Sequence, residues 1–194
     1  MFRRSLALLL ALLLALGFAT SAWADGRQDL RTAFSRNLAL KAFKATMFDL
    51  SSKQAVSTIE FQAPDRYRMT MPGQPPSVVI GDTMYMTRNG KTMKMTMPKG
   101  SFGKFRNEDA MAELEKGLVV ESLGPGMVGA VPARRYRFTS TTDKQASTSE
   151  VWVGTSTGLV LKVETSGKNA GRPFAMRVSY SDFNSPAIRI DAPK

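Results

Sequence analysis

Residues 67–97 read YRMTMPGQPPSVVIGDTMYMTRNGKTMKMTM. Methionine occupies every second position in three runs of this stretch, which are Met69 and Met71, then Met84 and Met86, then Met93, Met95 and Met97. Side chains alternate between the two faces of a β-strand, so a period of two predicts strands with methionine on one face. Asn89-Gly90 separates the second run from the third and suits the positive φ angles of a two-residue type I′ turn. The stretch therefore predicts a β-hairpin with thioethers on one face.

The turn also predicts the register of this hairpin. With Arg88 and Lys91 flanking the turn, the directly opposed pairs are Thr87 with Thr92, Met86 with Met93, Tyr85 with Lys94, and Met84 with Met95. Opposed residues point to the same face, with β-carbons about 4.5–5.5 Å apart. The thioethers should therefore form one continuous patch. The opposite face should contact water, because it carries Thr87, Thr92, Thr96, Tyr85 and Lys94.

Three interpretations of this methionine face remain open. Methionine is unbranched and adaptable, whereas Val and Ile have the better β propensity, so a methionine face suits a variable apolar partner such as a lipid. The same face could instead be ordinary core, packed under helices. Thioethers also select Cu(I), and the opposed methionine pairs could bring sulfurs together. Against copper, the chain has no His and no Cys, and Tyr67 shares the face of Met69 and Met71.

The N-terminus has the features of a secretory signal peptide over residues 1–24. Arg3 and Arg4 form a basic segment, an apolar run follows from Leu6 to Leu16, and Ala22-Trp23-Ala24 fits a cleavage site after Ala24. The apolar run is too short to span a bilayer, which takes about 20 helical residues. We therefore expect a periplasmic mature protein comprising residues 25–194, folded as a single domain. Because the chain has no Cys, neither a lipid anchor nor a disulfide is expected.

The charge is strongly basic. Loss of Arg3 and Arg4 lowers the formal net charge from +11 to +9. Such a field attracts anionic lipid surfaces, acidic proteins or nucleic acid, and nucleic acid is excluded for an exported protein. The cations are spread over alternating strands, so a solvated outer face with weak contact to anionic membrane surfaces is the expectation.

Beyond the methionine stretch, the pattern predicts an α+β protein that is mainly antiparallel β, with eight to ten strands and two helices. A helix from Asp25 carries an apolar stripe of Leu30, Ala33, Phe34 and Leu38. Residues 124–132 and 98–106, rich in Gly and Pro, are expected to be loops. A short helix over residues 108–116, with Asn107 as N-cap, is either a lid over the methionine face, held by Met111 and Leu114, or a fixed connector.

The remaining strands alternate apolar with polar residues and are separated by turns, which suggests an antiparallel meander. They are centred on Phe43 to Met47, Ile59 to Phe61, Val78 to Ile80, Leu118 to Leu123, Tyr136 to Phe138, Glu150 to Val153, Leu159 to Glu164 and Phe174 to Tyr180, and Ile188 and Ile190 close the chain.

Several segments together resemble the LolA/LolB-like superfamily, including its relatives of the LppX and LprG type. They are FQAPDRYRM at 61–69, VVIGDTMYM at 78–86, EVWV at 150–153, GLVLKVE at 158–164 and the ending from Tyr180 to Pro193. The resemblance implies an unclosed, curved half-barrel sheet whose concave face holds acyl chains under a helical lid. The residues it places in the cavity are Phe61, Tyr67, Met69, Met71, Met84, Met86, Met93 and Met95.

The resemblance implies a function as a periplasmic carrier or binder of lipid acyl chains or lipoproteins, shuttling towards the outer membrane. Lipoprotein carriers of the family tend to have an arginine immediately before the proline matched by Pro64, and this chain has Ala63 there. A generic carrier of lipids or lipid anchors therefore fits better. Expected partners are a lipid or acylated protein and membrane partner proteins, and the chain is expected to be monomeric. An envelope sensor that reuses this sheet is the alternative.

The residues argue against an enzyme. Without His or Cys, the chain lacks the common catalytic triads, thiol nucleophiles and zinc sites. Ser101-Phe102-Gly103-Lys104 formally matches a Ser-x-x-Lys motif, but the partner motifs of that enzyme class are incomplete and the glycines oppose the helix it needs. No cofactor is expected.

Overall fold

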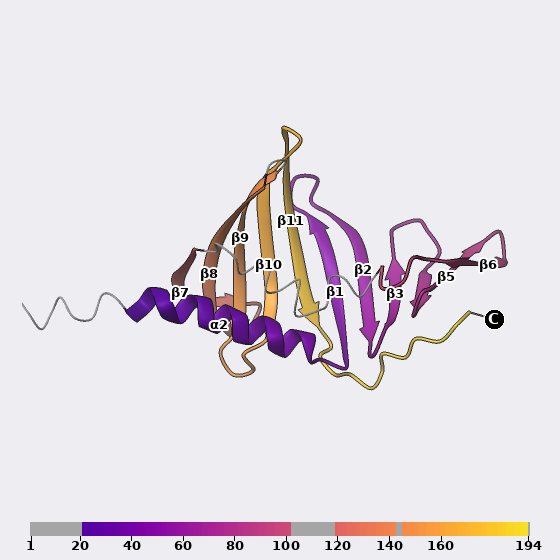
Figure 1. Cartoon of the computed structure of the whole chain (residues 1–194), viewed down its shortest axis with the longest axis horizontal. Coiled ribbons are helices and arrows are strands. Elements are labelled where there is room, and N and C mark those ends of the chain that lie inside the picture. Colours follow the sequence, from indigo (N-terminus) through magenta and orange to yellow (C-terminus); the bar gives the residue numbers. More distant parts are fainter. Residues whose placement is uncertain (1–20, 102–118, 143–144, 194) are drawn as a thin grey trace, which may run out of the picture.

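The computed structural model describes residues 21–101, 119–142 and 145–193, which form one helix and one sheet (Figure 1). The elements are α2 (Ser21–Leu38), β1 (Ala42–Asp49), β2 (Gln54–Gln62), β3 (Arg66–Thr70), β4 (Ser77–Ile80), β5 (Thr83–Arg88), β6 (Lys91–Thr96), β7 (Val120–Val128), β8 (Val131–Thr142), β9 (Gln145–Gly154), β10 (Val160–Asn169) and β11 (Arg172–Ser181). The α+β class is confirmed, although the sheet has 11 strands and not eight to ten. Within the described residues, no helix is both long and apolar enough to cross a membrane.

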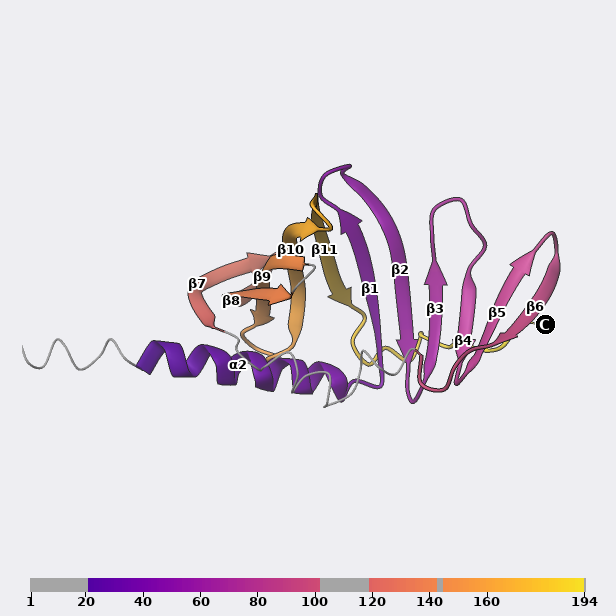
Figure 2. The same ribbon diagram turned by 45° about the horizontal axis from the view of Figure 1, so that its top comes forward.

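The sheet consists of two meanders joined at one place. Its strand order is β6-β5-β4-β3-β2-β1-β11-β10-β9-β8-β7, so every neighbouring pair except β1 and β11 is consecutive in the chain. We call the β1–β11 pair the seam. β6 and β7 are the two edges, and the sheet curves without closing (Figure 2). The predicted unclosed half-barrel is therefore confirmed.

Helix α2 lies across the β7–β10 part of the sheet on its concave face (Figures 1 and 2). The apolar stripe predicts this contact, because Leu30 and Ala33 are buried and Phe34 packs beside them. Their partners in the sheet are Val120, Tyr136, Phe138, Val151, Val153 and Val160. The helix begins at Ser21, four residues before the expected start at Asp25.

Polar contacts hold this helix at its middle and at its end. At its middle, Asp29 accepts a hydrogen bond from the Tyr136 hydroxyl at 2.5 Å and forms an ion pair with Arg134 at 2.9 Å. At its end, the Asn37 side chain accepts from the Val160 amide at 2.9 Å and donates to the Val160 carbonyl at 3.2 Å. The Asn37 amide thus pairs with β10 in the way that a neighbouring strand would, and the orientation of α2 is set at two separated points.

The expected loop over residues 124–132 is wrong, because β7 continues to Val128 and β8 begins at Val131. The pairing shifts register between Ser122 and Gly124, and Gly124 has a φ of +77°. Glycine provides such an angle without strain, so this residue forms a bulge and not a strand end. Pro125 is tolerated because β7 is an edge strand, where a missing amide donor costs no ladder hydrogen bond.

The convex face differs from the concave one in carrying ordered charge. Arg137 pairs with Glu150 at 2.8 Å, and Arg68 pairs with Glu60 at 2.6 Å. Glu164 on β10 accepts from Arg177 on β11 at 2.8 Å and from Lys162 on its own strand at 3.2 Å. The solvated outer face inferred from the charge therefore includes ion pairs between adjacent strands.

The C-terminal segment covers part of this convex face, where Ile188 and Ile190 are buried against Ala42 and Val78. Tyr85 packs at the edge of the same cluster, so the expectation that its face meets only water is wrong. Sequence periodicity could not show this, because the partner is a segment about a hundred residues further along the chain. Arg66 and Gln62 hold the segment by hydrogen bonds to the backbone of Ile190 at 2.7 Å each.

Candidate functional site

The methionine hairpin, which we define as β5, Asn89-Gly90 and β6, has the predicted register at every pair. The ladder opposes Met84 to Met95, Tyr85 to Lys94, Met86 to Met93 and Thr87 to Thr92, with Arg88 opposite Lys91. Asn89 has a φ of +50° and Gly90 a φ of +74°, the positive angles that a type I′ turn requires. The turn therefore does set which face each methionine occupies.

Strand pairing extends this face across the sheet in two rows of directly opposed residues. The first row runs from β6 to β1 through Met95, Met84, Val79, Tyr67, Phe61 and Phe43. The second runs through Met93, Met86, Ser77, Met69, Ile59 and Ala45, and reaches Tyr180 across the seam. Directly opposed residues share a face, so seven of the eight predicted cavity residues lie together on the concave side. The eighth, Met71, follows the end of β3.

Burial falls along these rows from the centre of the sheet to its β6 edge. Phe61 and Tyr67 are 2% and 8% exposed, whereas Met93 and Met95 are each 47% exposed. Met69 and Met84 are half-buried between these extremes and pack against the buried cluster. We call the exposed end, comprising Met93, Met95 and the 41% exposed Met71, the methionine rim.

Aromatic rings form the buried floor of the face. The Phe43 and Phe61 ring centroids are 5.2 Å apart, and those of Phe61 and Tyr67 are also 5.2 Å apart. Tyr180 from the other meander adds an edge contact to Phe43 at 5.8 Å. Such tilted rings pack rigidly. Phe61 and Tyr67 therefore belong to the packed core, and the accessible part of the predicted site is its methionine end.

Neither row contains a residue that is charged at neutral pH. The groups with shifted pKa values lie elsewhere, at a hairpin turn or on the convex face. Backbone amides of Ser51 and Ser52 donate to Asp49 at 2.7 and 3.2 Å and lower the pKa of its carboxyl. A hydrogen bond to Glu150 raises the pKa of Arg137. Among the described residues, no group of three or more His, Cys, Asp or Glu side chains could hold a metal ion.

The predicted lid falls outside the described residues, since Met111 and Leu114 both lie within 102–118. Its role over the methionine face stays a prediction.

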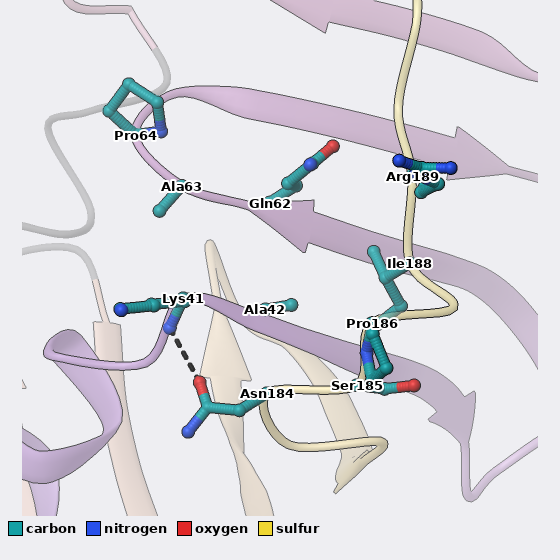
Figure 3. Close-up of a pocket in the computed structure, with 10 residues that line it drawn as sticks. All are labelled: Lys41, Ala42, Gln62, Ala63, Pro64, Asn184, Ser185, Pro186, Ile188 and Arg189. Atoms are coloured by element: carbon teal, nitrogen blue, oxygen red, sulfur yellow. Dashed lines mark hydrogen bonds between the residues drawn. The ribbon is translucent and has the colours of Figure 1, made fainter.

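A separate cavity of about 520 Å³ lies beside the C-terminal segment, at the start of β1 and the turn between β2 and β3 (Figure 3). Sequence reasoning missed it, because its walls come from opposite ends of the chain. The Lys41 amide donates to Asn184 at 2.8 Å, and the Ile190 amide donates to Gln62 at 2.7 Å. These side-chain oxygens already hold the C-terminal segment in place, so we assign the polar groups of the cavity to attaching this segment to the sheet.

Comparison with solved structures identifies the architecture. The lipoprotein LppX of Mycobacterium tuberculosis matches over 87% of this chain and 99% of its own, with a TM-score of 0.64 and 12% identity. The chain has the LppX fold. LprF of Mycobacterium bovis shares the LppX fold with a TM-score of 0.62 and 11% identity, over 88% of this chain and 97% of its own.

MucB contains a more distant version of the LppX fold, with a TM-score of 0.52 and 14% identity over 88% of this chain. This chain spans 63% of the MucB chain. No protein-family model matches the sequence, and no curated protein matches it either. The fold implied by the resemblance to proteins of the LppX and LprG type is therefore confirmed. Because identities this low show the fold alone, the ligand is argued from this chain's own residues.

Proposed function

We propose that the protein binds lipid acyl chains, or acylated proteins through their acyl chains, on the concave face and carries them through the periplasm towards the outer membrane. The observation that carries this proposal is the pair of uncharged rows that run from an aromatic floor to the exposed methionine rim. The LppX fold supports it, because an unclosed sheet leaves a concave face available to a ligand. The signal peptide expected over residues 1–24 supports the location.

The chemistry of the rim suits an acyl chain. Methionine side chains are flexible and polarisable, so they can follow a chain that bends and varies in length. Burying one methylene is worth about 0.8 kcal/mol, so a sixteen-carbon chain offers on the order of 12 kcal/mol before the cost of association. Binding is then favourable with a modest contact area, and the carrier would act by controlling release.

Met95→Asp tests the site with a control on the same strand. Met95 lies on the concave row and Thr96 is exposed on the opposite face, so Thr96→Asp adds the same charge one residue away. We expect Met95→Asp to weaken binding of cis-parinaric acid at least tenfold, because a carboxylate must be desolvated beside the acyl chain. Thr96→Asp should leave the affinity within about twofold. Equal affinities in both folded variants would contradict the proposal.

Native mass spectrometry of the protein purified from a bacterial periplasm, followed by lipid extraction, would name the cargo. A co-purifying acylated species supports the carrier. A protein that takes up Cu(I) but no fatty acid would support the thioether metal site instead. The sensor alternative shares the same fold and makes a different prediction, since a sensor changes its affinity for a partner protein when the lipid binds.

A further inference from the structure

The methionine hairpin and the residues that follow it form a segment that carries charge of one sign only. Between Thr83 and Ser101 there are four cations, Arg88, Lys91, Lys94 and Lys99, and no carboxylate. All four are exposed. Among the ion pairs formed between described residues, none involves these four side chains. No ion pair within the described part of the chain therefore neutralises the charge of Arg88, Lys91 or Lys94.

The same segment exposes apolar side chains beside the cations. Met93 and Met95 are each 47% exposed on the concave side of β6, and Lys94 lies between them on the other face. Met71 is 41% exposed in the connection between β3 and β4. In this meander that connection and the Asn89-Gly90 turn lie at the same end of the sheet (Figure 2). Arg88, Lys91 and the exposed methionines thus occupy one corner of the molecule. Lys99 lies at the other end of the hairpin, where the amide of the next residue, Gly100, donates to Asp82 at 2.9 Å.

From this combination we infer that the methionine hairpin is a docking surface for an anionic phospholipid bilayer. Arg88 and Lys91 at the turn face lipid phosphates, and the methionine rim enters the interfacial layer beneath them. Each basic side chain near an anionic membrane surface contributes independently to the attraction. Nucleic acid would neutralise the cations but leave the thioethers in water, whereas an anionic bilayer neutralises the cations and also buries the thioethers.

Position makes this surface useful to a carrier. β6 is an edge strand and carries the first residue of each concave row, Met95 and Met93. An acyl chain leaving a bilayer at this edge meets the rim first and continues inward past Met84. This account of cargo transfer rests on the proposed function, but docking itself is measured on vesicles in the absence of cargo uptake.

The chain offers a matched pair of variants for the test. Arg88→Glu with Lys91→Glu reverses the two exposed cations beside the β5–β6 turn. Lys168→Glu with Arg172→Glu reverses two exposed cations beside the β10–β11 turn, which lies at the same end of the sheet. Both double variants change the net charge of the protein by the same amount. Sedimentation with vesicles of phosphatidylglycerol and phosphatidylcholine, compared with vesicles of phosphatidylcholine alone, measures partitioning.

We expect the unmodified protein to bind the anionic vesicles and to lose binding as salt is raised. The Arg88 and Lys91 reversal should reduce the partition coefficient about 25-fold or more, from about fivefold for each charge. The control reversal should change it less than about threefold. Equal losses in the two variants would show attraction by net charge alone and overturn the docking site, as would equal binding to neutral vesicles.

Circular dichroism and cis-parinaric acid binding in vesicle-free solution separate this result from the proposed function. The hairpin reversal should retain both the fold and the affinity for the fatty acid. If no variant binds the fatty acid while vesicle binding still depends on Arg88 and Lys91, the docking surface stands and the carrier proposal fails. If the fatty acid binds and vesicle partitioning is the same for all the variants, the carrier proposal stands and the docking surface fails.

Discussion

On the concave face, helix α2 covers strands β7–β10, whereas strands β3–β6 have no helix over them among the described residues. Under the helix, Val151 and Val160 are no more than 1% exposed. At the other end of the same sheet, Met93 and Met95 are 47% exposed. Two halves of one continuous surface, built from strands of similar pattern, therefore differ in whether a described helix covers them.

The side chains under α2 also differ in type from those at the methionine end of the sheet. The covered half uses Val, Tyr and Phe, which have few rotamers and pack against a partner of fixed shape. The open half uses methionine, which adapts to partners of variable shape. This difference is what the proposed function would require, with the helix-covered half stabilising the fold and the methionine half receiving the ligand.

The largest effect that separates the two halves should come from matched truncations. Leu30→Ala removes a buried side chain from α2 and leaves a cavity above β7–β10, so it should lower the free energy of unfolding by roughly 2–4 kcal/mol. Met95→Ala removes a similar volume from an exposed position and should cost less than about 0.5 kcal/mol. Urea unfolding of both variants measures the difference. Equal losses would mean that the methionine end is structural core.

A smaller effect tests how firmly the covering helix is held. Tyr136→Phe deletes the hydroxyl that donates to Asp29, and a hydrogen bond to a charged group is worth about 1.5–3 kcal/mol. Because Arg134 still pairs with Asp29, we expect a loss of about 1–2 kcal/mol in unfolding free energy. A double-mutant cycle with Asp29→Asn provides the control. Strictly additive losses would show that the hydroxyl does not couple the helix to the sheet.

The smallest effect lies on the convex face in the β10–β11 pair, next to the seam. Burial acts to raise the pKa of Glu164, but hydrogen bonds from Arg177 and Lys162 outweigh it and lower the pKa below the ordinary 4.5. The stabilisation is therefore present above the unfolded pKa and is lost as pH falls through the lowered folded value. Because these side chains are partly exposed, we expect a contribution under about 1 kcal/mol.

Glu164→Gln removes this titration. Urea unfolding between pH 6 and pH 3 should show a shallower loss of stability in the variant than in the unmodified protein. Identical pH profiles would argue that the Glu164 ion pairs contribute nothing to the stability of the fold.

Local signals in the sequence predicted the methionine hairpin to the residue. A period of two defined the faces, and Asn89-Gly90 defined the register, because both depend only on neighbouring residues. The N-terminal helix was predicted for the same reason, since its stripe repeats within a few turns. Seven of the eight candidate cavity residues consequently fall on one face.

Features that depend on distant pairing were not predictable in this way. Gly124 and Pro125 indicated a loop, but their position on an edge strand is known only once the strand order is known. Tyr85 was expected to meet water, and the C-terminal segment that covers it comes from the far end of the sequence. The gradient from buried Phe61 to the exposed rim likewise depends on where α2 and the seam lie, and not on any residue pattern.

The seam has a consequence for how the protein folds. Each meander grows by adding a strand next to the one made just before it, and such local contacts form quickly. The β1–β11 pair is different, because it joins the first of the described strands to the last of them. On a ribosome or during export, the aromatic floor around Phe43 must therefore wait for Tyr180, almost the final residue of β11, to arrive. The two halves of the concave face can each begin early, but they become one surface only after β11 has been made.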